Sequence, residues 1–219
     1  MTFYFPKTPK FVTWLYPKRI WAFSRVKNTI YLTFDDGPIP EVTPWVLDIL
    51  KKYNAKATFF CIGVNIEKNP NIFSRVKREG HDIGNHTFNH LKGTKTPTRK
   101  YLDNVLAFEE FIQQSNNPSI QPPKLFRPPY GKLTQKQAKR IRQKGYNIIM
   151  WDVLSYDWDN RVSEEKCLQN VLKNIRPGSI IVFHDSLKAK KNLTYTLPKV
   201  LGFIQEKGWK SKGLNDEIV

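Results

Sequence analysis

Short apolar runs alternate with segments of helical spacing along most of the chain. The runs are rich in β-branched and aromatic residues and occupy residues 28–34, 56–63, 81–85, 124–129, 146–153 and 178–185. Between them, apolar side chains recur at helical intervals in residues 41–53, 67–79, 97–114, 134–144, 163–175 and 195–205. Strands that alternate with helices through short connections predict a parallel sheet, open or closed into a barrel. Since no linker or internal repeat interrupts the pattern, it indicates one α/β domain.

Polar side chains of chemical interest follow the ends of the predicted strands. In parallel α/β folds the loops after the strands converge on one crevice, so these side chains should meet. The residues expected at that edge are Asp35, Asp36, His86, His90, Arg127, Tyr130, Asp152, Asp157, Trp158, His184 and Asp185. Three of the four histidines belong to this set, which a scatter of core or surface histidines would seldom produce. The pattern therefore predicts a functional site at this edge.

Basic residues outnumber acidic ones along the chain. Its 219 residues include 36 Lys and Arg against 19 Asp and Glu, a formal net charge of +17. Such an excess favours a polyanionic partner: nucleic acid, anionic lipid or an acidic polysaccharide. The basic residues occur in several separate runs, which is typical of solvated helix faces. Because no helix-turn-helix, RRM or zinc-finger spacing accompanies them, we expect no specific nucleic-acid partner.

Residues 1–27 differ from the rest and are interpreted as an N-terminal extension of a domain that spans residues 28–219. The extension mixes aromatic residues with Lys and Arg, as membrane-interface segments do, but we expect its aromatics to pack on the domain. Pro and Lys interrupt its apolar runs, so we recognise no signal peptide and no transmembrane segment. The expected location is cytoplasmic, or peripheral to the membrane or cell envelope. Cys61 and Cys167 lie in apolar or helical surroundings and are interpreted as buried thiols.

The stretch HTFNH places His86 and His90 four residues apart. On one helical turn the two imidazoles would lie on the same face and could share a metal ion. Asp35 and Asp36 end the first strand as adjacent carboxylates, which repel each other unless a cation or a shared proton offsets them. One of these carboxylates would supply a third ligand. Two histidines and one Asp leave a coordination position open, which is typical of catalytic metal sites.

Five ordered motifs surround these residues. The chain reads TFDDG at 33–37, HTFNH at 86–90, RPPYG at 127–131, LSYDW at 154–158 and VFH at 182–184. In order and spacing they resemble the motifs of the NodB-homology polysaccharide deacetylases, carbohydrate esterase family 4, which are T-F-D-D-G, H-x-x-x-H, R-x-P-Y, D-x-x-D-W and L-x-H. The resemblance extends from about residue 28 to residue 185. It implies a distorted (β/α) barrel with fewer than eight regular strands.

The resemblance also implies a division of labour between the two carboxylates. Asp36 would join His86 and His90 in binding one divalent metal, with zinc as the expected ion and cobalt or nickel as alternatives. Asp35 would act as general base on a water that the metal acidifies. His184, as an imidazolium, would protonate the departing amine, which is otherwise a very poor leaving group.

Further roles follow from the same resemblance. Arg127 would keep Asp35 ionised, and Asp157 would pair with Arg127 or orient His184. The metal and a backbone N–H near Tyr130 would hold the oxyanion. The residues assigned to substrate contact are Pro129, Tyr130 and Trp158. Asp185, beyond His184, has either a turn role or a catalytic one.

The fourth motif departs from the family pattern, because Leu154 stands where the family has an Asp. Side chains two residues apart on a strand share a face, so Asp152 could supply the missing carboxylate to the site. Alternatively, Asp152 only forms hydrogen bonds with a neighbouring loop. Val182, in place of the fifth motif's Leu, is a milder change because it is also apolar.

These observations predict a metal-dependent hydrolase that removes N-acetyl groups from the amino sugars of a polysaccharide or glycan, peptidoglycan-like or chitin-like. The substrate could be anionic, in view of the net charge. Two alternatives are an O-acetyl ester deacetylase acting on a xylan-like polymer, and a glycan-binding or nucleic-acid-binding protein with decayed catalysis. The complete set of acidic, basic and histidine residues argues against decay. The oligomeric state is left open.

Overall fold

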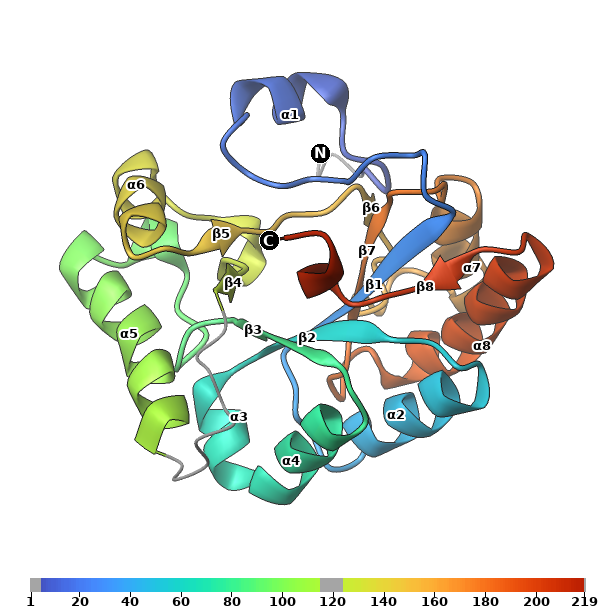
Figure 1. Cartoon of the computed structure of the whole chain (residues 1–219), viewed down its shortest axis with the longest axis horizontal. Helices are drawn as coiled ribbons and strands as arrows, with labels where there is room; N and C mark the ends of the chain where they lie inside the picture. The colour runs from blue at the N-terminus through green and yellow to red at the C-terminus, as the bar shows by residue number, and fades with distance from the viewer. Residues whose placement is uncertain (1–4, 115–123, 219) are drawn as a thin grey trace.

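One curled sheet of parallel strands forms the centre of the molecule (Figure 1). The computed structural model describes residues 5–114 and 124–218. Within these residues the strands are β1 (Thr29–Asp35), β2 (Ala57–Cys61), β3 (Asp82–Asn85), β4 (Leu125–Phe126), β5 (Asn147–Ile148), β6 (Val153–Leu154), β7 (Ile180–His184) and β8 (Lys210–Ser211). Their order is β5-β4-β3-β2-β1-β7-β6, and β8 pairs with β1. This arrangement confirms the distorted (β/α) barrel.

Helices cover the outside of the curled sheet (Figure 1). They are α2 (Thr43–Lys52), α3 (Gly63–Lys68), α4 (Pro70–Arg78), α5 (Thr98–Gln114), α6 (Gln135–Gln143), α7 (Glu164–Leu172) and α8 (Lys190–Glu206). Helix α1 (Lys10–Leu15) lies apart from them, at the top of the view, and buries none of its residues. Each predicted helical segment has a counterpart, whereas α1 and α3 were not expected. The Thr134 hydroxyl accepts a hydrogen bond from the Gln137 N–H and caps α6, which fixes where that helix begins.

Strand β1 shows how the sheet separates its two faces. Ile30, Leu32 and Phe34 belong to a large apolar cluster that includes residues of α2 and α8. Tyr31 belongs instead to a smaller cluster, together with Phe60 of β2. Because side chains alternate along a strand, Asp35 shares the face of Tyr31 and lies inside the curl. The Asp35 carboxylate therefore lies inside the barrel, at the end of β1.

The apolar run 146–153 was predicted as one strand, but it divides into β5 and β6. These strands pair with β4 and β7 respectively, and no ladder joins them to each other. The N-terminal segment lies along this opening. The Ile20 N–H donates to Ile148 O at 2.9 Å, and the Leu154 N–H donates to Pro6 O at 2.8 Å. Isolated bridges at Lys7 and Ile20 therefore complete the edge that the sheet leaves open.

The aromatic residues of the N-terminal segment divide into two groups. Trp21 and Phe23 pack against buried apolar clusters, as expected. The expectation is wrong for Phe11 and Trp14, which point to solvent from α1. The first four residues of the extension lie outside the described part of the chain.

Among the described residues, no helix has the length and apolar character needed to cross a membrane. Cys61 and Cys167 are both buried free thiols, as expected.

Candidate functional site

The predicted site residues converge because their strands end at one edge of the sheet. Asp35 is the last residue of β1, and it lies directly opposite His184 at the end of β7. His86 follows β3, and Arg127 follows β4. The Arg127 N–H donates to Asn85 O at 3.0 Å, which aligns these two strand ends. Asp157 comes three residues after β6. Parallel pairing thus gathers residues from distant parts of the sequence.

Asp36, His86 and His90 form a cluster that could hold a metal ion. Asp36 Oδ1 lies 3.2 Å from His90 Nε2 and 3.7 Å from His86 Nε2. One potential ligand atom from each residue lies within 4.8 Å of the others. One carboxylate oxygen and two imidazole nitrogens suit zinc and its divalent neighbours. The residues present therefore fit the metal that the family implies.

The two histidines do not lie on a helical turn, so that expectation is wrong. Residues 86–90 form a loop after β3. Thr87 and His90 have left-handed backbone, with φ of 66° and 55°, and these angles turn the loop back on itself. The imidazole rings of His86 and His90 end 5.1 Å apart between centroids. The curvature of the loop therefore brings the two imidazoles together, as the spacing of a helical turn would have done.

His86 has a defined orientation and tautomer. Its Nδ1 lies 2.8 Å from the carbonyl oxygen of Arg127, an atom that can only accept a hydrogen bond. Nδ1 must therefore carry the proton, and the Nε2 lone pair faces Asp36. Burial lowers the pKa of His86 to about 4, so its ring is neutral at pH 7. A neutral imidazole with one nitrogen fixed by a carbonyl is the form that binds metals.

Asp36 lies in the same small space, and its carboxylate is ionised. Burial by itself would raise the pKa of Asp36. The hydrogen bond with His90 and the positive charge of His184 outweigh burial and hold that pKa well below its ordinary value. The Asn65 side-chain amide donates to Asp36 O at 2.7 Å and fixes the backbone beneath it.

Asp35 forms an ion pair with Arg127. Arg127 Nη1 donates to Asp35 Oδ1 and to Thr33 Oγ1, each at 2.7 Å. Its Nη2 donates to Met150 O at 2.9 Å, and its guanidinium lies over the ring of Phe60. Arg127 is completely buried, and this burial lowers its pKa, whereas Asp35 raises it. Arg127 thus pairs with Asp35 and not with Asp157.

His184 pairs with Asp157, one of the two partners considered for that carboxylate. His184 Nδ1 lies 2.8 Å from Asp157 Oδ1, and the His184 N–H donates to Asp157 Oδ2 at 2.7 Å. Burial lowers the pKa of His184, but the Asp157 charge and hydrogen bond outweigh it and raise that pKa to about 9. His184 therefore carries a proton at pH 7, and none of the described residues forms a hydrogen bond with its Nε2.

Asp152 does not supply a carboxylate to this edge, and the interpretation that it replaces the missing Asp is wrong. It lies just before β6, at the opposite end of the strand from Asp157. Its Oδ2 accepts hydrogen bonds from Ser179 Oγ at 2.7 Å and from Lys7 Nζ at 2.5 Å. Asp152 therefore has a structural role, as in the alternative interpretation, and it also anchors the N-terminal segment through Lys7.

Asp185 has a turn role and lies beneath the site. Its Oδ1 accepts from the Gly37 N–H at 2.9 Å, and its Oδ2 accepts from Thr43 Oγ1 at 2.6 Å. Complete burial raises the pKa of Asp185 to about 8. The carboxyl ties the turn after β1 to the start of α2. Sequence reasoning did not assign Thr33, Thr43 or Asn65, although Thr33 belongs to the first motif.

Comparison with known proteins agrees with this geometry. The polysaccharide deacetylase family model matches residues 24–149. A peptidoglycan-N-acetylglucosamine deacetylase of Bacillus cereus is 34% identical over 202 residues, covering 91% of this chain and 89% of that protein. The chain belongs to the polysaccharide deacetylase family.

Other relatives extend the comparison. A chitooligosaccharide deacetylase of Bradyrhizobium is 36% identical, covering 72% of this chain and 71% of that protein. The crystal structure of a peptidoglycan N-acetylglucosamine deacetylase superposes with a TM-score of 0.85 at 35% identity, covering 95% of this chain and 96% of that one. These likenesses confirm the resemblance seen in the five motifs.

Aromatic side chains form the rim of the deacetylase site. The Tyr130 ring centroid lies 4.7 Å from that of His90, and Tyr130 is largely exposed. Trp158 lies 4.6 Å from His184 and stacks on Tyr156 at 5.0 Å. Pro129, which was also assigned to substrate contact, precedes Tyr130 in the sequence but is buried, so it forms no part of the exposed rim. One part of the rim, at Tyr130, thus lies beside His90, a candidate metal ligand. The other part, at Trp158 and Tyr156, lies beside His184.

A groove of about 410 Å³ continues from these rims. Tyr130 and Tyr156 line it, as does Leu154, the residue that departs from the family pattern. The N-terminal segment contributes its other wall, with Phe5, Pro9, Val12, Tyr16, Arg19 and Trp21. Leu154 therefore belongs to an apolar wall of this groove.

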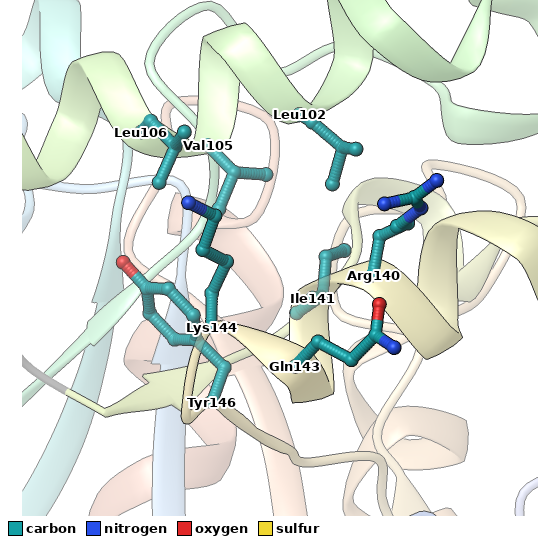
Figure 2. Close-up of a pocket in the computed structure, with 8 residues that line it drawn as sticks. All are labelled: Leu102, Val105, Leu106, Arg140, Ile141, Gln143, Lys144 and Tyr146. Atoms are coloured by element: carbon teal, nitrogen blue, oxygen red, sulfur yellow. The ribbon is translucent and has the colours of Figure 1, made fainter.

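A second hollow, of about 230 Å³, lies between α5 and α6 (Figure 2). Leu102, Val105 and Leu106 of α5 face Ile141 there, and Lys144 and Tyr146 close one side. None of its lining residues belongs to the site described above. This hollow therefore has no part in the chemistry proposed below.

Proposed function

We propose that this deacetylase removes N-acetyl groups from the amino sugars of a peptidoglycan-like or chitin-like glycan. One observation carries the proposal: a metal-competent Asp36, His86 and His90 cluster shares one edge of the sheet with two separate ion pairs. Amide hydrolysis needs an electrophile, a base and an acid at one point, and these three groups match those needs.

The residues that would hold the metal are Asp36, His86 and His90, and we propose zinc as the ion. Three protein ligands leave room for water or substrate, as catalytic zinc sites require. When bound, the metal would supply a Lewis acid that acidifies water and polarises the acetyl carbonyl. Cobalt and nickel suit the same donor atoms.

Asp35 is proposed as the general base. It would take a proton from water as the water oxygen forms its bond to the carbonyl carbon. Arg127 holds the Asp35 carboxylate in one orientation, and because Arg127 is charged it favours the ionised form. Thr33 fixes Arg127 in turn, by accepting a hydrogen bond from it and donating one to Ile181 O. A base held by this chain of contacts needs little reorganisation during the reaction.

His184 is proposed as the general acid. As the carbon–nitrogen bond breaks, its Nε2 proton would pass to the amine nitrogen, so that acetate and a free amino sugar leave. Asp157 binds the opposite ring nitrogen, which keeps the proton available where it is needed. We propose that the Tyr130 N–H stabilises the oxyanion, and that Trp158 forms a wall beside the sugar ring.

The groove supports a polymeric substrate. It borders Tyr130 and Tyr156, so a sugar at the site would have neighbours that extend along aromatic surfaces. Flat apolar faces of sugar rings pack well on such side chains. An extended groove of this kind fits a chain of sugars better than a single amino sugar.

The test is acetate release from N-acetylglucosamine oligomers, peptidoglycan and acetylxylan, before and after treatment with a chelator. We expect release from the amide substrates, its loss on chelation and its return with zinc. Release from acetylxylan alone would favour the ester alternative. No release from any substrate by metal-loaded protein would favour a binding protein.

Paired substitutions test the two adjacent carboxylates. Asp35→Asn should reduce kcat by about a hundredfold or more, because the general base is lost, and should retain the metal. Asp36→Asn should lower metal affinity by at least about tenfold. Metal analysis of the purified variants checks both. A metal-free Asp35→Asn protein would contradict the assignment of the base.

A further inference from the structure

Helix α1 presents an apolar face to solvent. Phe11 is 65% exposed, Trp14 82% and Leu15 57%. These positions are three and four residues apart, so they lie on one side of the helix. Val12 and Tyr16 occupy the other side and line the groove. Within the described part of the chain this outer side is therefore uncovered, although large apolar residues seldom gather in the open on a soluble protein.

Cations border this apolar face. Leu15 lines a shallow hollow of about 350 Å³ together with Lys18, Arg19, Lys139 and Arg142. The Arg19 guanidinium lies over the ring of Tyr16, 4.2 Å from its centroid. Within residues 5–114 and 124–218, none of these four cations forms an ion pair. The hollow is therefore strongly positive and has no internal counter-charge from an ion pair.

The sequence concentrates positive charge on the two segments that build this face. Residues 1–34 and residues 111–151 contain no Asp or Glu. They hold fourteen of the 36 Lys and Arg residues of the chain. The first segment includes α1 and the second includes α6, and both border the open edge of the sheet at β5 (Figure 1). Four of these fourteen, Lys7, Lys27, Lys124 and Arg127, form ion pairs with carboxylates outside the two segments, so the other ten make up the excess charge.

We propose that this face binds the surface of an anionic lipid bilayer. Phe11, Trp14 and Leu15 would enter the boundary between headgroups and acyl chains, where aromatic residues are favoured. Lys18, Lys139 and Arg142 would meet lipid phosphates, since cations near an anionic surface add to the attraction. We call these six residues the α1 patch.

The combination of residues decides between possible partners. A soluble polyanion without rings, such as polyphosphate, would need the cations but would gain nothing from an exposed Trp14. A second copy of the chain would carry the same positive charge on the same face, so the two faces would repel each other. An anionic bilayer would bind both the exposed apolar side chains of α1 and the cations beside them. The inference does not depend on the proposed chemistry, because no member of the α1 patch belongs to the site.

The experiment is co-sedimentation of the full chain with vesicles. One set contains phosphatidylcholine alone and the other a mixture of phosphatidylcholine and phosphatidylglycerol. We expect binding to the mixed vesicles, and a decrease of at least about tenfold in the partition coefficient for Phe11→Ser combined with Trp14→Ser. Val26→Ser is the matched control, because Val26 is 92% exposed but lies outside the patch; it should bind like the parent chain.

A second pair of variants separates charge from location. Lys139→Glu combined with Arg142→Glu should weaken binding by at least about fivefold per cation. Lys190→Glu combined with Lys191→Glu changes net charge equally, at the start of α8, and should weaken binding less. Thermal unfolding of each variant confirms that it folds like the parent chain.

Several results would overturn the proposal. One is parental vesicle binding by the Phe11→Ser and Trp14→Ser variant. Another is equal weakening by the two charge-reversed variants. Binding to soluble polyphosphate as tight as to mixed vesicles, and independent of Trp14, would assign the face to a polyanion. A dimer of the parent chain that the Trp14→Ser variant cannot form would assign it to self-association.

Discussion

Asp35 and Asp36 are neighbours in sequence but serve different partners, because the backbone turns between them. Asp36 has φ of 84°, in the left-handed region that non-glycine residues seldom occupy. The turn sends Asp35 to Arg127 and Asp36 to the histidines. Tyr130 and Tyr156, on the rims, also have positive φ. Backbone of this kind costs about 1–3 kcal/mol per residue, so the surrounding contacts must maintain it.

Asp157 is predicted to set the pH range over which His184 can act as an acid. The raised pKa of His184, about 9, keeps its acid form populated through neutral pH and lets it decline above that value. Asp157→Asn removes the main cause of the raised pKa, so the basic limb of kcat/KM should move to lower pH. Activity should then decrease more at pH 8 than at pH 6. Rate profiles over this range test the expectation.

Asp152→Asn is the control for that experiment. Asp152 pairs with Lys7 and Ser179 at the other end of β6, so its substitution should leave the pH profile in place. A matching shift of the basic limb in Asp152→Asn would contradict the placement of Asp152 away from the site.

At the scale of elements, the turn after β1 positions Asp36, one of the three proposed metal ligands. Gly37 follows Asp36, and its N–H donates to the buried Asp185 carboxyl. A Cβ at Gly37 would lie 1.9 Å from Asp185 Oδ2, closer than any contact allows. Position 37 therefore accepts glycine alone without movement of the turn.

Gly37→Ala should accordingly decrease the free energy of unfolding by about 1–3 kcal/mol and weaken metal binding, because the turn that carries Asp36 must shift. Urea unfolding and metal titration measure the two effects. Gly202→Ala in α8 is the control: apart from its neighbours in the chain and the backbone of its own helix, no atom lies within 4 Å of the added Cβ. Its helix should gain about 0.5–1 kcal/mol. Equal metal affinity in both variants would contradict the role of the turn.

The sequence predicted the regular elements well where one period dominated. Helices α5 and α6 and strands β1 and β7 follow from apolar spacing, and Ser163 caps α7 as expected of its type. Local sequence spacing gave wrong predictions where tertiary contacts determine the conformation. His86 and His90 have a helical interval but lie in a loop. Residues 146–153 have the pattern of one strand but divide into β5 and β6, which pair with different strands.

The same reasoning explains which site residues could be predicted. Asp35 and His184 end their strands and Arg127 follows one, so parallel topology was enough to bring them together. Asp152 was misplaced because it precedes its strand, β6, and only the strand boundary reveals this. Asp185 left two roles open, and the buried contacts with Gly37 and Thr43 decided between them.

At the scale of the whole molecule, the net charge of +17 should assist the capture of an anionic glycan. The Debye length decreases from about 10 Å at 0.1 M salt to about 3 Å at 1 M, so exposed charges act over shorter distances. KM for an anionic polymer should therefore rise with salt much more than kcat falls. A neutral oligosaccharide measured in parallel should show little change, and equal salt sensitivity would refute the idea.

The opening between β5 and β6, along which the N-terminal segment lies, also has a consequence for the order in which the chain folds. Thr8 contacts Trp151 across 143 residues of sequence, and Lys7 reaches Asp152 across 145. During synthesis the first half of each contact emerges early and must wait for its partner. Such distant closure is entropically slow, because the intervening chain must be ordered before the contact forms. The N-terminal segment should therefore be among the last parts to dock, after the β1–β4 half of the barrel has already assembled.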